Sequence, residues 1–281
     1  MTADPIHLRR GGTSVVIDRS RGGIPAIAYW GPDLGPMGQR ELDSLVISGT
    51  TQQVPVLPEP LASLTLLPLE SQAWQYEPAL LGAGVDGRNA TPSFSLAEIR
   101  SYDDGLVVVS SDEASGLDIE LELRLGVTGL LSQRATIVNK GNVDFMVDSL
   151  QLSFPLPATA VELMDATGRH LKERSPQTAR LFVGTYARES RKGRPGSDAS
   201  LLLLAGTAGF GSEPGSCTGC TSPGAAIIGC SRFGRRTPRP ILPAASCCSL
   251  AKDFSNPGSL HNTLGHRELG NRAGRALRSV P

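Results

Sequence analysis

The sequence predicts an all-β protein, a sandwich of two large antiparallel sheets. Three observations indicate this class. Residues 117–125, LDIELELRL, alternate between apolar and charged side chains, and a period of two residues is typical of a strand with one buried face. Several other apolar segments are bounded by turn residues, as in all-β domains. Helix-period stretches with caps are scarce, which argues against a fold that alternates strands and helices.

Each expected strand has its own signal. The segment DDGLVVVSSDE indicates a strand near residues 106–110, and SLLLLAG indicates a buried strand near residues 199–205. Residues 133–139 and 145–153 form two strands, because Lys140-Gly141-Asn142 between them is a turn signal. In residues 117–125, the alternation places Ile119, Leu121 and Leu123 on the inward face.

Two possible enzyme motifs are weak. GAGVDG, residues 82–87, matches the glycine pattern of dinucleotide-binding loops. That loop should follow a strand and open a helix, whereas here Pro92 disfavours a helix. A plain glycine loop is the better interpretation. A Ser-His-Asp triad is not supported either, because His7 and His170 are the only histidines of residues 1–215 and no serine lies in a G-x-S-x-G motif.

Charge and cysteine are both unevenly distributed along the chain. The net charge is zero over 281 residues, but residues 216–281 hold nine basic residues against Asp253 and Glu268, a net charge of +7. A basic tail can bind nucleic acid. The first residues do not match the pattern of a leader peptide, so we expect none, and no apolar run is long enough to span a membrane. We therefore expect a cytoplasmic protein with no membrane partner.

All five cysteines lie in the tail, at positions 217, 220, 230, 247 and 248. Four thiolates could bind zinc, but the ligand pairs lack the usual repeat of C-x₂-C. A disulfide framework is not favoured without an export signal. A small zinc-binding protein is thus a third-ranked hypothesis, which metal analysis of the purified protein would test.

Two long segments carry distinctive motifs. Residues 7–35 read HLRRGGTSVVIDRSRGGIPAIAYWGPDLG, and residues 168–211 contain a Gly-Arg pair, Glu-Arg-x-Pro-Gln and Arg-x-Gly-Arg-x-Gly-x-Asp. In order and spacing these segments resemble the N-terminal domain of bacterial glycoside hydrolase family 36 α-galactosidases. The similarity covers about residues 7–214. Thr178 departs from it, because the family usually has a basic residue after Pro-Gln.

This resemblance implies a fold and a parent enzyme. The family domain is a β-supersandwich, similar to galactose mutarotase, that precedes a catalytic (β/α)8 barrel. Two barrel aspartates hydrolyse terminal α-linked galactose with retention. Their Lys-Trp-Asp motif is absent, because neither Trp30 nor Trp74 is followed by Asp, so no catalytic residue, cofactor or metal is expected here. The parent is expected to be a homo-oligomer that acts on α-galactoside oligosaccharides.

One family loop reaches a neighbouring subunit's active site and carries a motif like Gly-Asp-x-Arg-x-Pro. The nearest match here is GVDGRNATP, with Asp86, Arg88 and Pro92. A carboxylate and a guanidinium suit sugar hydroxyls, because one accepts and the other donates hydrogen bonds. Asp86 and Arg88 are therefore the candidate substrate-binding residues. The alternative, left open by the sequence, is that Asp86-Gly87 only forms a turn.

The tail departs from the family after residue 215. Plausible codons for residues 219–230, read one base earlier, spell a string close to the expected family segment. The same shift turns the codons of residues 245–258 into another family-like string. The final stretch gives a family-like string in the third frame, which requires a second frameshift near residues 258–260. We therefore expect a native domain over residues 1–215 and an irregular, frameshifted tail over residues 216–281. Its cysteines and basic charge would be products of the shifted frame, with no nucleic-acid partner.

The sequence thus predicts a truncated, non-catalytic fragment of an α-galactosidase. An intact carbohydrate-binding or assembly module that functions without a barrel is the alternative, and a packed, ordered tail would favour it.

Overall fold

The computed structural model describes residues 4–49, 64–74, 76–188, 199–210, 217–221, 227–232 and 246–253. This part of the chain divides into two compact units. The first ends at Leu152, and the second runs from Ser153 to Asp253. The division falls within the strand β9 (Phe145–Pro155).

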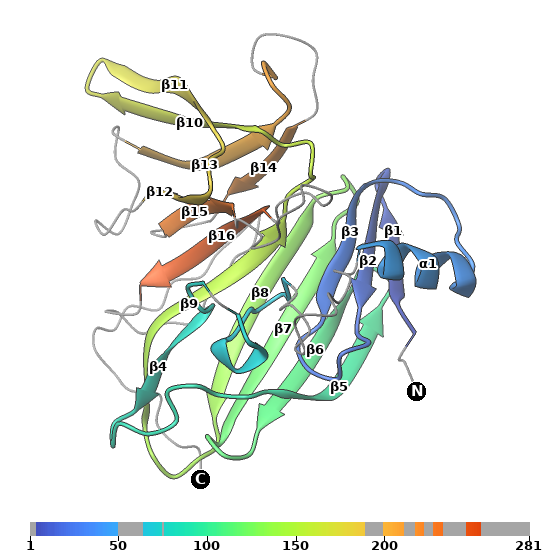
Figure 1. Cartoon of the computed structure of the whole chain (residues 1–281), viewed down its shortest axis with the longest axis vertical. Helices are drawn as coiled ribbons and strands as arrows, with labels where there is room; N and C mark the ends of the chain where they lie inside the picture. Colours follow the sequence, from blue (N-terminus) through green and yellow to red (C-terminus); the bar gives the residue numbers. More distant parts are fainter. Residues whose placement is uncertain are drawn as a thin grey trace, which may run out of the picture. The chain divides into compact units, whose positions relative to one another are not determined.

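The first unit holds most of the sheet structure (Figure 1). Its other elements are β1 (Ile6–Arg10), β2 (Thr13–Asp18), β3 (Ala26–Pro32), helix α1 (Gln39–Gly49), 3-10 helix η1 (Glu70–Gln72), β4 (Leu80–Gly84), β5 (Ser95–Tyr102), β6 (Gly105–Asp112), β7 (Leu117–Leu125) and β8 (Leu131–Asn139). Strands β1–β3 form one antiparallel sheet and β5–β8 form another, while β4 pairs with β9.

Strand β7 shows why this sequence forms a sheet. Its five alternate apolar residues, from Leu117 to Leu125, are each at most 2% exposed. The intervening charged residues lie on the other face, where Asp118 forms an ion pair with Lys140. The predicted inward placement of Ile119, Leu121 and Leu123 is confirmed. Removal of this apolar face from water is a dominant source of stability for such a sheet.

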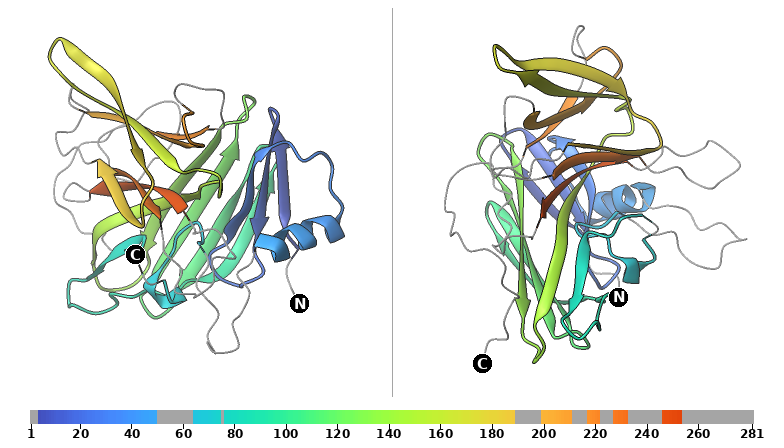
Figure 2. Two further views of the ribbon diagram at one scale, coloured as in Figure 1. Left: turned by 45° about the horizontal axis from the view of Figure 1, so that its top comes forward. Right: turned by 90° about the vertical axis from the view of Figure 1, so that its left-hand side faces the viewer.

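The second unit contains the remaining strands (Figure 2). They are β10 (Glu162–Arg169), β11 (Lys172–Arg180), β12 (Gly184–Arg188), β13 (Ala199–Gly206), β14 (Cys217–Thr221), β15 (Ile227–Arg232) and β16 (Ser246–Asp253). One sheet has the order β11-β10-β13-β14, and β15 pairs with both β12 and β16. In the first of these sheets, Leu203 of β13 and Leu163 of β10 are buried.

The all-β class and the five expected strands are confirmed by β6, β7, β8, β9 and β13. Among the described residues, the strands are assigned to four sheets. Helix α1 was not predicted. It begins where the Glu41 carboxylate accepts a hydrogen bond from the Gly38 N–H at 2.7 Å, and it buries Leu42.

The sequence predicts an irregular tail over residues 216–281. Strands β14, β15 and β16 lie within it and pair antiparallel with neighbouring strands. Residues 211–216, 222–226, 233–245 and 254–281 lie outside the described residues.

In the part of the chain that the structure describes, no helix is long and apolar enough to cross a membrane.

Candidate functional site

Asp86 and Arg88 lie on one tight turn at the end of β4. The Gly84 N–H donates to the Arg88 carbonyl at 2.8 Å, and the Gly87 N–H donates to the Gly84 carbonyl at 2.8 Å. Gly87 has a φ of +77°, a conformation that suits glycine. The Val85 N–H donates to the Asp144 carbonyl at 2.9 Å, which ties the turn to the start of β9. No helix follows, so GAGVDG is not a dinucleotide-binding loop.

The Asp86 carboxylate helps to build this turn. Its Oδ1 atom accepts a hydrogen bond from the Arg88 N–H at 3.0 Å. A Cβ atom on Gly84 would lie only 2.6 Å from this Oδ1 atom, so the carboxylate occupies the space that the glycine leaves. Asp86 is therefore part of the turn itself.

The same turn leaves polar groups open to a ligand. Both residues are exposed, and only Oδ1 of Asp86 takes part in the turn. Within the described ranges, no hydrogen bond or ion pair involves the Arg88 guanidinium. One carboxylate oxygen and five guanidinium N–H groups can therefore face a polyhydroxylated molecule. Pro92 does not join them, because it is buried and its carbonyl accepts from Ser71 Oγ at 2.8 Å.

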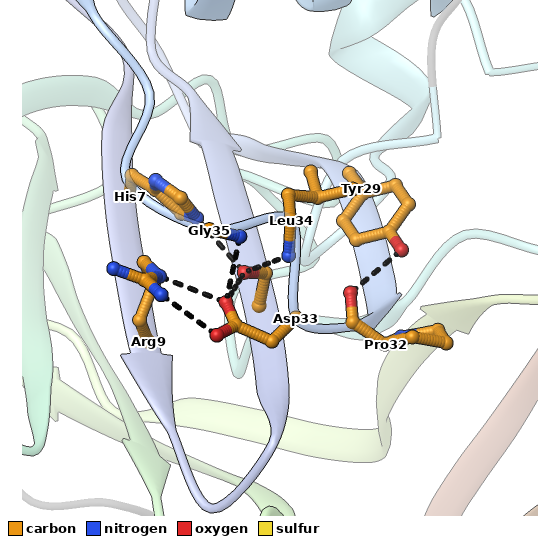
Figure 3. Close-up of polar contacts among 8 residues, drawn as sticks. His7, Arg9, Tyr29, Pro32, Asp33, Leu34 and Gly35 are labelled. Atoms are coloured by element: carbon orange, nitrogen blue, oxygen red, sulfur yellow. Dashed lines mark hydrogen bonds and ion pairs between the residues drawn. The ribbon is translucent and has the colours of Figure 1, made fainter.

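A second polar cluster joins β1, β2 and the segment after β3 (Figure 3). Arg9 donates to both carboxylate oxygens of Asp33, at 2.8 and 2.7 Å. Ser14, which is fully buried, donates from Oγ to Asp33 Oδ1 at 2.8 Å. The N–H of Gly35 also donates to Oδ1, at 3.2 Å. Nothing in the sequence pattern selected this cluster, because Arg9 and Asp33 are 24 residues apart.

The cluster contains histidine, serine and aspartate, but it is not a catalytic triad. Ser14 lies between His7 and Asp33, whereas a triad places histidine in the middle. Because Ser14 Oγ donates its proton to Asp33, His7 Nε2, 3.0 Å away, acts as the donor to Ser14. Ser14 Oγ also accepts from the Leu34 N–H at 3.0 Å. A buried hydroxyl with its proton held by a carboxylate has a structural role.

The cluster shifts two pKa values downward. Hydrogen bonds from Arg9 and then Ser14 hold the pKa of Asp33 far below its usual range. Burial, followed by the positive charge of Arg9, lowers the pKa of His7 below 6.5. In both cases the unfolded chain binds a proton more readily than the folded chain does. Acid therefore favours unfolding through both groups.

This linkage predicts how stability depends on pH. As the pH falls through about 6.5, the unfolded histidine gains a proton first, so His7 begins to lower the free energy of unfolding. Asp33 adds its own loss only below about pH 4. Chemical denaturation at several pH values between 5 and 7 gives the free energy of unfolding at each pH. This free energy should change less with pH in His7→Gln than in the unsubstituted protein. His170→Gln controls for loss of a histidine, and an unchanged slope in His7→Gln would contradict the assignment.

A third cluster holds β12 against the β10–β11 hairpin. Asp165 is 6% exposed, and its Oδ2 atom accepts from Tyr186 Oη at 2.8 Å. Gln177 donates from Nε2 to the same Oη at 3.2 Å. The network provides hydrogen bonds to a buried carboxylate, which is costly to leave unpaired.

Across the described residues, no group of three or more His, Cys, Asp or Glu could hold a metal ion.

The molecule is thus an all-β protein built from antiparallel sheets. The model of the glycosyl hydrolase family 36 N-terminal domain matches residues 23–222, and the chain belongs to this family.

Known relatives agree with this assignment. An α-galactosidase of Escherichia coli is 28% identical over 130 residues, which are 46% of this chain and 18% of that enzyme. Two solved α-galactosidases of Geobacillus stearothermophilus share the fold. AgaA has 17% identity and a TM-score of 0.69 over 87% of this chain and 37% of its own. AgaB has 17% identity and a TM-score of 0.68 over 88% and 36%. The chain thus spans well under half of each relative.

Proposed function

We propose that this chain is the non-catalytic N-terminal domain of an α-galactosidase whose parent removes terminal α-linked galactose from oligosaccharides. The family match over residues 23–222 carries this proposal. The Escherichia coli relative is an α-galactosidase. Structures of AgaA variants contain raffinose and stachyose, which suggests the substrate class of the parent.

The reaction assigned to the parent requires groups that this proposal places outside the chain. Hydrolysis with retention needs a nucleophilic carboxylate and a proton-donating carboxylic acid, about 5–5.5 Å apart and on either side of the scissile bond. In the proposed parent both come from the barrel. The only tryptophans, Trp30 and Trp74, do not precede an aspartate, so the expected nucleophile motif has no match. The proposed role of this domain is therefore structural and in substrate binding.

In the same proposal, Asp86 and Arg88 bind sugar hydroxyls at the active site of a neighbouring subunit in a cytoplasmic homo-oligomer. The support is geometric. The turn holds the two residues at the end of β4 with the guanidinium and one carboxylate oxygen exposed. A site that uses such groups discriminates strongly between a hydroxyl and its absence.

Two substitutions separate the turn role of Asp86 from the binding role. Asp86→Asn keeps an oxygen that can accept the Arg88 N–H, whereas Asp86→Ala removes it. In protein made from the gene with its frame restored, Asp86→Asn should raise KM for an α-galactoside about tenfold or more, because a hydrogen bond to a charged group is lost. The midpoint of thermal unfolding of Asp86→Asn should stay near that of the unsubstituted protein. An unchanged KM would refute the binding role.

The proposal also covers the boundary at residue 215 and the origin of the tail. Residues 1–215 are the native domain, and residues 216–281 are translated in a shifted frame. The DNA downstream of codon 215 tests this directly. A barrel-coding frame that is offset from the present one is expected. The absence of such a frame would contradict both the fragment and the tail assignments.

A second candidate function is a carbohydrate-binding or assembly module that works without a barrel. Strands β14, β15 and β16, the described part of the tail, favour it, because such a module would use the tail within its own sheets. The two proposals differ in one measurable property. A self-sufficient module should bind galactosides on its own in calorimetric titration, and Arg88→Ala should abolish the signal. The fragment should show no such binding.

A further inference from the structure

We propose that one face of the sheet β11-β10-β13-β14 is a surface through which two copies of this chain associate (Figure 1). Successive side chains of a strand lie on opposite faces of its sheet. On one face, Leu163 of β10 and Leu203 of β13 are 2% and 0% exposed. The next residue of each strand, Met164 and Leu204, lies on the other face, where both are partly exposed. We call this second face the outer face.

The register shows which residues share the outer face. Thr178 of β11, Met164, Leu204 and Gly219 of β14 are opposed in one row across the four strands. Leu202, two residues before Leu204, lies on the same face and is 44% exposed. A Cβ atom on Gly219 would lie 2.7 Å from Leu204 Cδ2 and 3.9 Å from Leu202 Cδ1. The two leucine side chains therefore extend over β14 and give the outer face an apolar centre.

The outer face is close to neutral. Over residues 162–166, 176–180 and 202–206 its charged members are Glu162 and Arg180, which are directly opposed to each other, so their charges offset. An interface with two-fold symmetry brings the same patch of both copies together. A patch with a net charge would repel its copy, whereas a neutral apolar patch is complementary to itself. The charge pattern therefore favours a second copy of this chain over an acidic or basic partner.

The size of the outer face indicates a weak dimer. Strands β10, β11 and β13 contain eight or nine residues and β14 contains five. With strands about 4.8 Å apart and a rise of about 3.3 Å per residue, the face covers roughly 500 Å². This is comparable with the largest apolar patches of typical monomers, which often have a function. A dimer would bury roughly 1,000 Å² from the two copies, which is near the lower limit for a specific interface, so we expect reversible association.

Sedimentation velocity of the purified chain in reducing buffer tests this inference. The concentration is varied a hundredfold, up to the upper micromolar range. The weight-average sedimentation coefficient should rise from that of a monomer towards that of a dimer and no further, because a two-fold interface closes on itself. A chain that stays monomeric at every concentration, or that forms oligomers without a limit, would overturn the inference. Because the experiment uses no sugar, its result is independent of the proposed α-galactosidase role.

Two substitutions place a charge on the outer face. Thr178→Lys and Leu202→Lys change exposed side chains, so both proteins should fold, which circular dichroism checks. The dissociation constant of the dimer should rise at least about tenfold in each, because a charge without a partner is costly to bury.

Leu171→Lys is the matched control. Leu171 is 85% exposed in the turn between β10 and β11, away from the centre of the outer face. Leu171→Lys removes an exposed leucine and adds the same charge in the same hairpin, so this protein should dimerise as the unsubstituted chain does. Unchanged dimerisation in either Thr178→Lys or Leu202→Lys would overturn the inference, and so would loss of the dimer in Leu171→Lys.

Discussion

Replacing Leu121 by alanine is expected to lower the free energy of unfolding by about 2–5 kcal/mol, as large-to-small substitutions in buried cores do. Leu121 is 2% exposed at the centre of β7, where it is opposed to Val108 of β6 and Ala135 of β8. The shortened side chain loses its transfer free energy and leaves a cavity that the neighbouring strands cannot fill. Urea denaturation followed by circular dichroism measures the change.

The matched control is Glu120→Ala, one position earlier on the same strand. Glu120 is exposed, so its replacement should change the free energy of unfolding by no more than about 0.5 kcal/mol. Similar losses for Leu121→Ala and Glu120→Ala would mean that the alternation along β7 does not define a buried face.

The second large effect is expected at Gly11, in the turn between β1 and β2. A Cβ atom there would lie 2.2 Å from the Gly129 nitrogen and 2.6 Å from the Val127 carbonyl oxygen. Both contacts are with backbone atoms of the turn between β7 and β8, which cannot rotate away. Gly11→Ala must therefore separate the two turns, and overpacking of this kind costs about 1–3 kcal/mol. Thermal denaturation should show a clear drop in midpoint.

Gly12 supplies the control because it shares the backbone conformation without the contact. Its φ is +76°, against +57° for Gly11, and no atom beyond its chain neighbours lies within 4 Å of the position that a Cβ atom would take. Both substitutions carry the cost of a left-handed conformation, about 1–2 kcal/mol. Only Gly11→Ala adds the clash. Equal effects of Gly11→Ala and Gly12→Ala would show that the two turns are not in contact.

The strands of this protein were predictable where one physical signal dominated. In β7 the apolar and charged residues alternate without interruption, and the burial of Leu117, Ile119 and Leu123 follows directly. Strand β5 shows the limit of this approach. Most of its side chains are exposed on both faces, so buried and exposed residues do not alternate along it. The strand forms because its backbone pairs with β6. Helix α1 was missed because only Leu42 of its residues is buried.

The candidate site was predictable only in part. The family resemblance made Asp86 and Arg88 candidate sugar-binding residues, with a simple turn as the alternative, and the structure places both residues on one turn. It separates Pro92 from them. The cluster around Asp33 could not be predicted from the sequence, because its members come from β1, β2 and the segment after β3. Contacts between residues so far apart in sequence depend on strand register, which composition does not reveal.

The most direct test of the account is whether this chain alone hydrolyses an α-galactoside. The purified protein is incubated with an aryl α-galactoside, and release of the phenol is followed against a buffer blank. No turnover above background is expected, because general acid–base catalysis contributes about 10²–10⁴-fold and the proposal places both carboxylates outside the chain. Turnover that persists after contaminating hydrolases are removed and disappears on Asp86→Ala would contradict the account, because the catalytic residues would then lie within this chain.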